Sequence, residues 1–181
     1  MNTAAKNLED DHVHILKLID VMNRIIGSET PDANHLESIV DIIRNFADGL
    51  HHAKEENQYF PYLAKRGFSL TQGPVAVMLH EHILGREHVK EIAENIPLYK
   101  NGNPAALGNI YRNMAGYAEL LQNHISKENN ILFRMADNAL SDADQQELLR
   151  LFDEAERNHA SGHPSSEYIE RIDKLAAVYG I

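Results

Sequence analysis

The sequence contains no cysteine and no tryptophan among its 181 residues. Without cysteine the chain can form no disulfide, no thiolate zinc site and no ordinary iron–sulfur cluster, and it offers no thiol nucleophile. Any metal site in this chain must therefore be built from imidazole nitrogen and carboxylate oxygen.

The chain also lacks long apolar runs and an excess of positive charge. No apolar stretch is long enough to cross a membrane, and the first residues, MNTAAKNLEDDHVH, lack the apolar core of a signal peptide. Acidic residues number 27 against 17 basic ones, which gives a formal net charge of −10. This charge opposes binding to nucleic-acid phosphates and to anionic membrane surfaces. We therefore expect a cytoplasmic protein without a nucleic-acid or membrane partner.

Apolar residues recur at intervals of three and four along nearly the whole chain, which is typical of amphipathic helices. Turn and capping residues divide this pattern. Gly27 is expected to end the first helix and Pro97 to stop the third, while Ser141 and Asp144 form a capping-box pattern before the fifth. The expected helices cover approximately residues 4–26, 32–66, 71–95, 103–140, 142–159 and 165–179.

Four long amphipathic helices joined by short loops predict an all-α fold, an antiparallel up-down four-helix bundle. The bundle is expected to cover about residues 4–140, with a C-terminal helical appendage over about 141–179. No segment has the composition of an interdomain linker, so we expect a single domain over residues 1–181.

Eleven histidines are present, and helical geometry sorts them by face, because residues at i, i+4 and i+7 lie on one side of a helix. Each of the four long helices is expected to place one histidine on its apolar side: His12, His51, His82 and His124. The remaining histidines lie on polar or intermediate rows. Of these, we expect His52, His80 and His88 to be exposed or to contact a ligand residue from outside, and His35, His159 and His163 to lie at the surface.

Two carboxylates share the inward faces. Glu55 follows His51 by four residues, and Glu128 follows His124 by four. A buried carboxylate is costly unless it is paired or bound to a metal ion. Two such residues, each one turn from an inward histidine, favour a metal site.

An internal repeat strengthens this interpretation. Residues 51–60 align without gaps with residues 124–133, and the histidine, lysine, glutamate and phenylalanine coincide. The pair Asp11-His12 likewise matches Glu81-His82. The second copy has Asn129 where the first has Glu56, which favours Glu55 as the ligand.

Two such half-sites together offer four imidazoles and two carboxylates, too many for one tetrahedral zinc ion. They suit two ions bridged by both carboxylates, with positions left for a solvent bridge and one exogenous ligand. Mixed imidazole and carboxylate ligation with open positions points to iron, with manganese or zinc as substitutes.

The chemistry-bearing residues fall into four short motifs: Asp11-His12-x-x-Ile15-Leu16, His51-His52-x-x-Glu55-Glu56-x-x-x-Phe60-Pro61, Met78-Leu79-x-Glu81-His82-x-x-Gly85-Arg86 and His124-x-x-x-Glu128. With these motifs, the sequence over residues 8–135 resembles the hemerythrin-like, or HHE cation-binding, family. The resemblance implies an up-down bundle that holds a non-haem di-iron centre with an oxo or hydroxo bridge. The implied ligands are His12, His51, Glu55, His82, His124 and Glu128.

The chain departs from the oxygen-carrying members at one position. Those proteins have a fifth histidine four residues from the ligand on the third helix, whereas here the residues four after and four before His82 are Arg86 and Met78. The sequence is thus more similar to the four-histidine, two-glutamate type, which includes di-iron proteins for repair of iron centres. Those repair proteins usually carry an additional cysteine-containing domain, for which this sequence has no cysteine.

Three functions are compatible with the pattern. The leading hypothesis is a di-iron protein that binds or reacts with dioxygen, nitric oxide or peroxide in sensing, storage or detoxification, with Tyr59 and Tyr117 either lining the ligand pocket or serving as core aromatics. The second is an iron donor for damaged iron centres. The third is a metal-free helical module that binds a protein partner through its C-terminal helices. Peroxide turnover is compatible with any di-iron site, so the pattern predicts neither an enzyme nor a pure binding protein.

Overall fold

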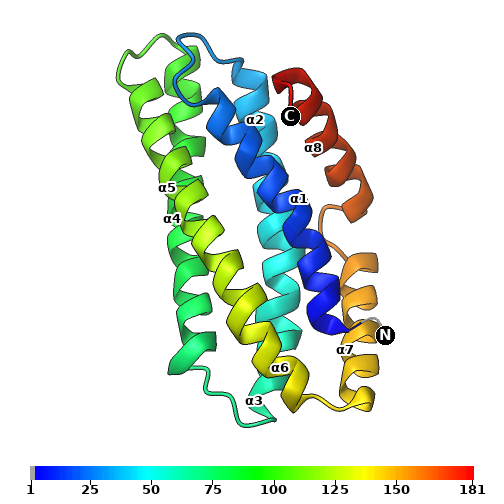
Figure 1. Ribbon diagram of the computed structural model, residues 1–181. Helices are drawn as coiled ribbons and strands as arrows, with labels where there is room; N and C mark the ends of the chain where they lie inside the picture. Colours follow the sequence, from blue (N-terminus) through cyan, green and yellow to red (C-terminus); the bar gives the residue numbers. More distant parts are fainter. Residues whose placement is uncertain (1–2) are drawn as a thin grey trace.

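A computed structural model describes residues 3–181, and within this range every regular element is helical (Figure 1). Three of the elements are π-helical segments, labelled η, that continue neighbouring α-helices. The elements are α1 (Ala4–Ile25), α2 (Ala33–Ile42), η1 (Ile43–His52), η2 (Glu55–Tyr59), α3 (Phe60–Ala64), α4 (Gly73–Lys100), α5 (Ala106–Lys127), η3 (Glu128–Leu132), α6 (Phe133–Ala139), α7 (Asp142–Arg157) and α8 (Ser165–Tyr179).

The elements assemble into four long rods that run alternately up and down (Figure 1). The rods are α1, the continuous run from α2 to α3, α4, and the continuous run from α5 to α6. Helices α7 and α8 lie outside the bundle, α7 against α1 and η2, and α8 along α1 and α2. The predicted antiparallel four-helix bundle with additional C-terminal helices is confirmed. None of the helices in residues 3–181 combines the length and the hydropathy needed to cross a bilayer.

The buried side chains form two separate apolar clusters. The larger one contains the second half of α1, most of α2 and η1, and the buried face of α8. The smaller one contains the first residues of α1, the segment around Tyr59 and Phe60, and the buried face of α7. The inward histidines and glutamates belong to neither cluster, and lie along each rod between the residues of the two. We call this set of six buried residues the polar layer: His12, His51, Glu55, His82, His124 and Glu128.

Several helix ends are formed by the residues that the sequence indicated. Asp32 caps α2 by accepting a hydrogen bond from the Asn34 amide at 2.8 Å. The capping box of Ser141 and Asp144 begins α7, and Gly27, with φ +94°, follows the end of α1. These local signals were sufficient because each cap depends on residues that are close in sequence.

Two expected helix ends of the third rod were wrong. Helix α4 begins at Gly73, after its N-cap Gln72, and not at residue 71, and it continues through Pro97 to Lys100. Proline removes one helical hydrogen bond, but contacts with the preceding part of the chain hold this last turn in place. The Tyr99 hydroxyl donates to the Pro31 carbonyl at 3.0 Å, and Lys100 pairs with Glu37 at 2.8 Å.

The π-helical segments occur where the repeated motifs lie. Segments η2 and η3 begin at Glu55 and Glu128, which are equivalent positions of the internal repeat, and η1 ends at His52. A π-helix joins residues i and i+5 and has a wider turn than an α-helix, and such segments are frequent at functional sites. The two rods that carry the His-x-x-x-Glu motifs therefore change their helical period at these motifs.

Candidate metal centre

The polar layer brings together the six residues that the sequence singled out. They come from α1, η1, η2, α4, α5 and η3, and each is buried, with at most 1 % of its surface exposed. Two groups of nitrogen and oxygen atoms lie within 4.8 Å of one another: His12, His51, Glu55 and Glu128 in one, and His52, Glu55, His82 and His124 in the other. We call the pair His12 and His51 the first half-site and the pair His82 and His124 the second half-site. The second group also contains His52, which the sequence did not single out as a ligand.

The two histidines of each half-site face each other through their Nε2 atoms. This distance is 3.0 Å between His12 and His51 and 3.2 Å between His82 and His124. The separation is the same in both half-sites to within 0.2 Å, as the internal repeat would require.

The two glutamates lie between the half-sites. Glu128 Oε2 is 3.2 Å from His12 Nε2 and 3.3 Å from His124 Nε2. Glu55 Oε2 is 3.8 Å from His51 Nε2 and 3.4 Å from His82 Nε2. Each carboxylate thus reaches one histidine of either half-site, which is the placement a bridging carboxylate needs.

Acceptors outside the polar layer determine which nitrogen of each ring carries hydrogen. The Nδ1 atom of His51 donates to Asp11 at 3.3 Å, and that of His124 donates to Glu81 at 3.0 Å. The other two rings have the same arrangement: His12 Nδ1 donates to Asn129 Oδ1 and His82 Nδ1 donates to Glu56 Oε1, both at 2.7 Å. With hydrogen on Nδ1, a neutral ring presents the lone pair of Nε2 inward, as ring nitrogens of metal-binding histidines do.

The centre of the polar layer has an excess of acceptors. Both carboxylate oxygens of Glu55 and both of Glu128 are buried without a hydrogen-bond partner. Burial alone would lower the pKa of His124, but the negative charge of Glu128 outweighs it and raises that pKa to about 10, so in the absence of a metal ion this ring takes up a proton as the positive charge. The histidine Nε2 atoms face each other, and the oxygens of Glu55 and Glu128 have no hydrogen-bond partner. Such a buried arrangement is stable only with positive charge between these atoms. Two divalent cations meet this requirement, and the donor set of imidazole and carboxylate fits iron, manganese or zinc.

Ion pairs behind the histidines also recur at equivalent positions of the internal repeat. Lys54 donates to Asp11 at 2.7 Å, and Lys127 pairs with Glu81 in the same manner. Burial acts to raise the pKa of Asp11, but the hydrogen bond from His51 and the charge of Lys54 lower it to about 2. Lys54 and Lys127 thus keep Asp11 and Glu81 negatively charged, and these two carboxylates orient His51 and His124. Sequence reasoning gave these residues no role, although the repeat contained both lysines and both acceptors.

His52 was expected on a polar row, either exposed or in contact with a ligand residue from outside. It is only 4 % exposed, so the exposed alternative is wrong, and its ring stacks on the His82 ring with centroids 3.8 Å apart, as the other alternative requires. The error arose from applying the α-helical period to η1. A π-helix bonds residue i to i+5 and therefore rotates less per residue than an α-helix, which brings His52 toward the buried side. Its repeat equivalent is Ile125, so this fifth buried imidazole belongs to the second half-site alone.

The other flagged histidines stay outside the site. His80 and His163 are exposed, and His88, His35 and His159 are half-buried. None of the five belongs to either group of potential metal-binding residues within residues 3–181.

The two tyrosines have different surroundings. Tyr59 packs in the smaller apolar cluster against Phe133 and Phe152, and Tyr117 lies in the larger cluster at the wall of a cavity. Both hydroxyls are buried without a partner, and burial raises the pKa of both phenols. Both groups therefore stay protonated at neutral pH.

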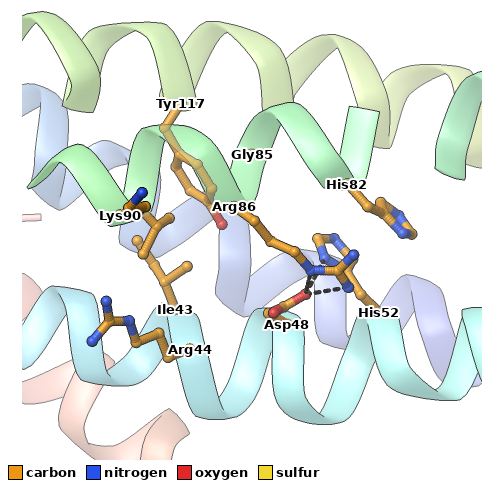
Figure 2. A pocket seen from close by; sticks show the side chains of 10 residues that line it. Ile43, Arg44, Asp48, His52, His82, Gly85, Arg86, Lys90 and Tyr117 are labelled. Atoms are coloured by element: carbon orange, nitrogen blue, oxygen red, sulfur yellow. Dashed lines mark hydrogen bonds and ion pairs between the residues drawn. The ribbon is translucent and has the colours of Figure 1, made fainter. Parts of the chain in front are cut away.

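The cavity beside the second half-site has a volume of about 110 Å³ and lies between η1, α4 and α5 (Figure 2). His52 and His82 line one part of it and Tyr117 another, with Arg86 extending from α4 toward Asp48 on η1. Arg86 donates to Asp48 at 2.8 Å and to Glu56 at 2.7 Å. These two carboxylates accept hydrogen bonds from His52 and His82, so one guanidinium orders both acceptors.

Comparison with known proteins agrees with this geometry. A family model described as the hemerythrin HHE cation binding domain matches residues 3–136, which is about three quarters of the chain and includes the whole polar layer. Searches among curated proteins and among solved structures gave no match. On the strength of the family match, the chain belongs to the hemerythrin HHE cation-binding family.

Proposed function

We propose that this chain is a non-haem di-iron protein whose centre binds or reacts with dioxygen, nitric oxide or peroxide. In this proposal His12 and His51 hold one iron, His82 and His124 hold the other, and Glu55 and Glu128 bridge them. The observation that carries the proposal is the set of four buried carboxylate oxygens without partners, surrounded by inward Nε2 atoms.

The residues of the chain prepare the site for cations before any ion arrives. Asp11, Asn129, Glu56 and Glu81 fix the ring orientations, so metal binding needs little reordering of side chains. The apolar clusters on either side keep bulk water away from the carboxylates. When bound, iron would supply redox chemistry and an open coordination position for a small exogenous ligand.

The direct test is metal analysis combined with optical spectroscopy. The apoprotein is reconstituted anaerobically with Fe(II), desalted and analysed for iron, and then exposed to air, nitric oxide or hydrogen peroxide. We expect two irons per chain and a near-ultraviolet charge-transfer band on oxidation. Two bound irons with a featureless spectrum under all three ligands would refute the reactivity. Less than one ion per chain after iron-replete expression would instead favour a metal-free interaction module.

Iron retention distinguishes this proposal from an iron donor. All six proposed ligands are at most 1 % exposed, so release of iron requires local opening of the bundle. We expect slow loss of iron to a strong chelator, whereas loss within the mixing time would favour the donor function.

A further inference from the structure

One buried ring nitrogen beside the second half-site has no partner. His52 Nε2 is buried and makes no hydrogen bond to any atom of residues 3–181. A buried polar atom without a partner is costly, so packing alone does not account for its position. The oxygens of Glu55 and Glu128 have the same deficiency, and they are the atoms between which the proposed function places cations.

The hydrogen bonds of His52 leave its Nε2 lone pair free. Nδ1 lies 3.3 Å from Asp48 Oδ1, and Arg86 donates to the same carboxylate at 2.8 Å (Figure 2). An ionised carboxylate can only accept, so the ring hydrogen lies on Nδ1 and the free donor atom is Nε2. His52 thus has the arrangement of the four histidines of the polar layer, with an acceptor outside the site at Nδ1 and an Nε2 without hydrogen.

His52 also lies within reach of an ion held by the second half-site. One ligand atom from each of His52, Glu55, His82 and His124 lies within 4.8 Å of the other three. Ligand atoms about 2.1 Å from one ion are at most about 4.2 Å apart, so movements of about 0.6 Å complete the set. The ring centroid of His52 is 3.8 Å from that of His82 and 5.7 Å from that of His124. The second half-site therefore has a third imidazole beside it.

The surroundings of His52 differ as a set from their repeat equivalents. The equivalents of His52, Asp48 and Arg86 are Ile125, Leu121 and Leu16. All three equivalents are apolar and belong to the larger apolar cluster or pack against it. The bundle can therefore pack with apolar side chains at these positions, and burying polar groups there is unfavourable unless they have a partner. The hydrogen bonds among His52, Asp48 and Arg86 satisfy the other polar atoms but not Nε2.

We propose that His52 is a further metal ligand, which binds the ion of the second half-site through Nε2 beside His82 and His124. This inference rests on the proposed di-iron function and deepens it, because it makes the two ions unequal. The ion of the second half-site has three imidazole ligands and that of the first half-site has two. The first metal ion to enter the metal-free protein therefore binds at the second half-site.

The first experiment follows zinc binding by NMR, because zinc is diamagnetic and its binding can be measured without any activity. Zinc is added to the metal-free protein in steps, up to two equivalents, while the ¹⁵N resonances of the histidine rings are recorded. We expect the Nε2 resonances of His52, His82 and His124 to change together in the first equivalent, and those of His12 and His51 in the second. A His52 resonance that stays unchanged while those of His82 and His124 change would overturn the inference.

The second experiment compares zinc affinity, measured by competition with a chelator, in the matched variants His52→Ile and His80→Ile. Isoleucine is the repeat equivalent of His52, so His52→Ile gives the second half-site the residue that the first already has. His80 is exposed on α4 and belongs to neither group of potential ligands. Losing a residue that only orients a ligand costs about 10- to 100-fold in metal affinity, so we expect His52→Ile to weaken the tighter zinc ion at least about 100-fold. His80→Ile should leave the affinity unchanged.

A purely structural role of His52 predicts a different result. In that case His52→Ile changes the Tm of the metal-free protein and leaves the zinc affinity of the folded protein as it was, which would refute the assignment. If zinc binds to His12, His51, His82 and His124 without His52, only this inference fails. If neither zinc nor iron binds, the proposed di-iron function fails with it.

Discussion

Lys54 provides a quantitative test of the charge layer around the metal centre. Its side chain is 1 % exposed, and its ammonium contacts Asp11 at 2.7 Å and Asn7 at 3.2 Å. Lys54→Met keeps a similar shape and removes the charge. The change leaves the Asp11 carboxylate in a largely buried position without its cation.

The expected cost follows from what Asp11 retains. Removing one partner of a buried ion pair costs about 3–5 kcal/mol, because the other charge remains buried. Asp11 keeps the hydrogen bond from His51 and is 13 % exposed, so the lower end applies, about 3 kcal/mol. For a chain of this length that corresponds to a decrease in Tm of about 6–12 °C.

Lys127→Met is the matched control because Lys127 occupies the equivalent position of the repeat and also pairs with a carboxylate, Glu81. Its side chain is 37 % exposed, so the ion pair of Lys127 with Glu81 should contribute about 0–1 kcal/mol to the free energy of unfolding. Urea unfolding of both metal-free variants, followed by circular dichroism, gives the comparison. Equal losses for Lys54→Met and Lys127→Met, or a loss below 1 kcal/mol for Lys54→Met, would refute this account of burial.

Three further predictions address the metal, the acid stability and the helix end. Glu128→Gln should reduce bound iron from two ions to one or fewer, as measured by elemental analysis, because both half-sites share this carboxylate; two retained ions would contradict its bridging role. Hydrogen bonds from Arg66 and Ser141 lower the pKa of Asp144 below its usual 3.8, so its contribution to stability is complete above about pH 4 and lost as the pH falls further. Asp144→Asn should therefore flatten the acid side of a urea-unfolding profile, and an unchanged profile would argue against this pair. Pro97→Ala restores one helical hydrogen bond in the last turn of α4, and we expect about 1 kcal/mol of stabilisation, seen as a Tm about 2–4 °C higher; a lower Tm would show that the proline is favourable there.

The sequence was sufficient to predict the four-helix bundle and the inward placement of the six residues of the polar layer. Both follow from periodicity along single helices, where an apolar stripe identifies the buried face. His12, for example, lies four residues from Leu8 and from Leu16, and all three face inward, Leu16 only partly. The capping box at Ser141 was equally local.

The features that could not be predicted depend on non-local contacts or on a change of helical period. His52 was assigned to a polar row because the α-helical period was assumed. The π-helical period of η1 is not indicated by any local residue pattern. The turn after Pro97 persists through contacts with the α1–α2 loop and α2, far away in sequence. The role of Asp11 as acceptor for His51 joins α1 to η1, and periodicity within one helix contains no information about such a pair.

The repeat that makes the donors of the two half-sites alike leaves their surroundings different. His82 is oriented by the carboxylate of Glu56, whereas His12 is oriented by the neutral amide of Asn129. A carboxylate acceptor makes the opposite ring nitrogen a stronger electron donor than an amide does. The second half-site should therefore favour the ion of higher charge, so the two positions should differ in redox potential. If two irons bind as proposed, a one-electron oxidised centre would then be valence-localised, with the ferric ion held by His82 and His124.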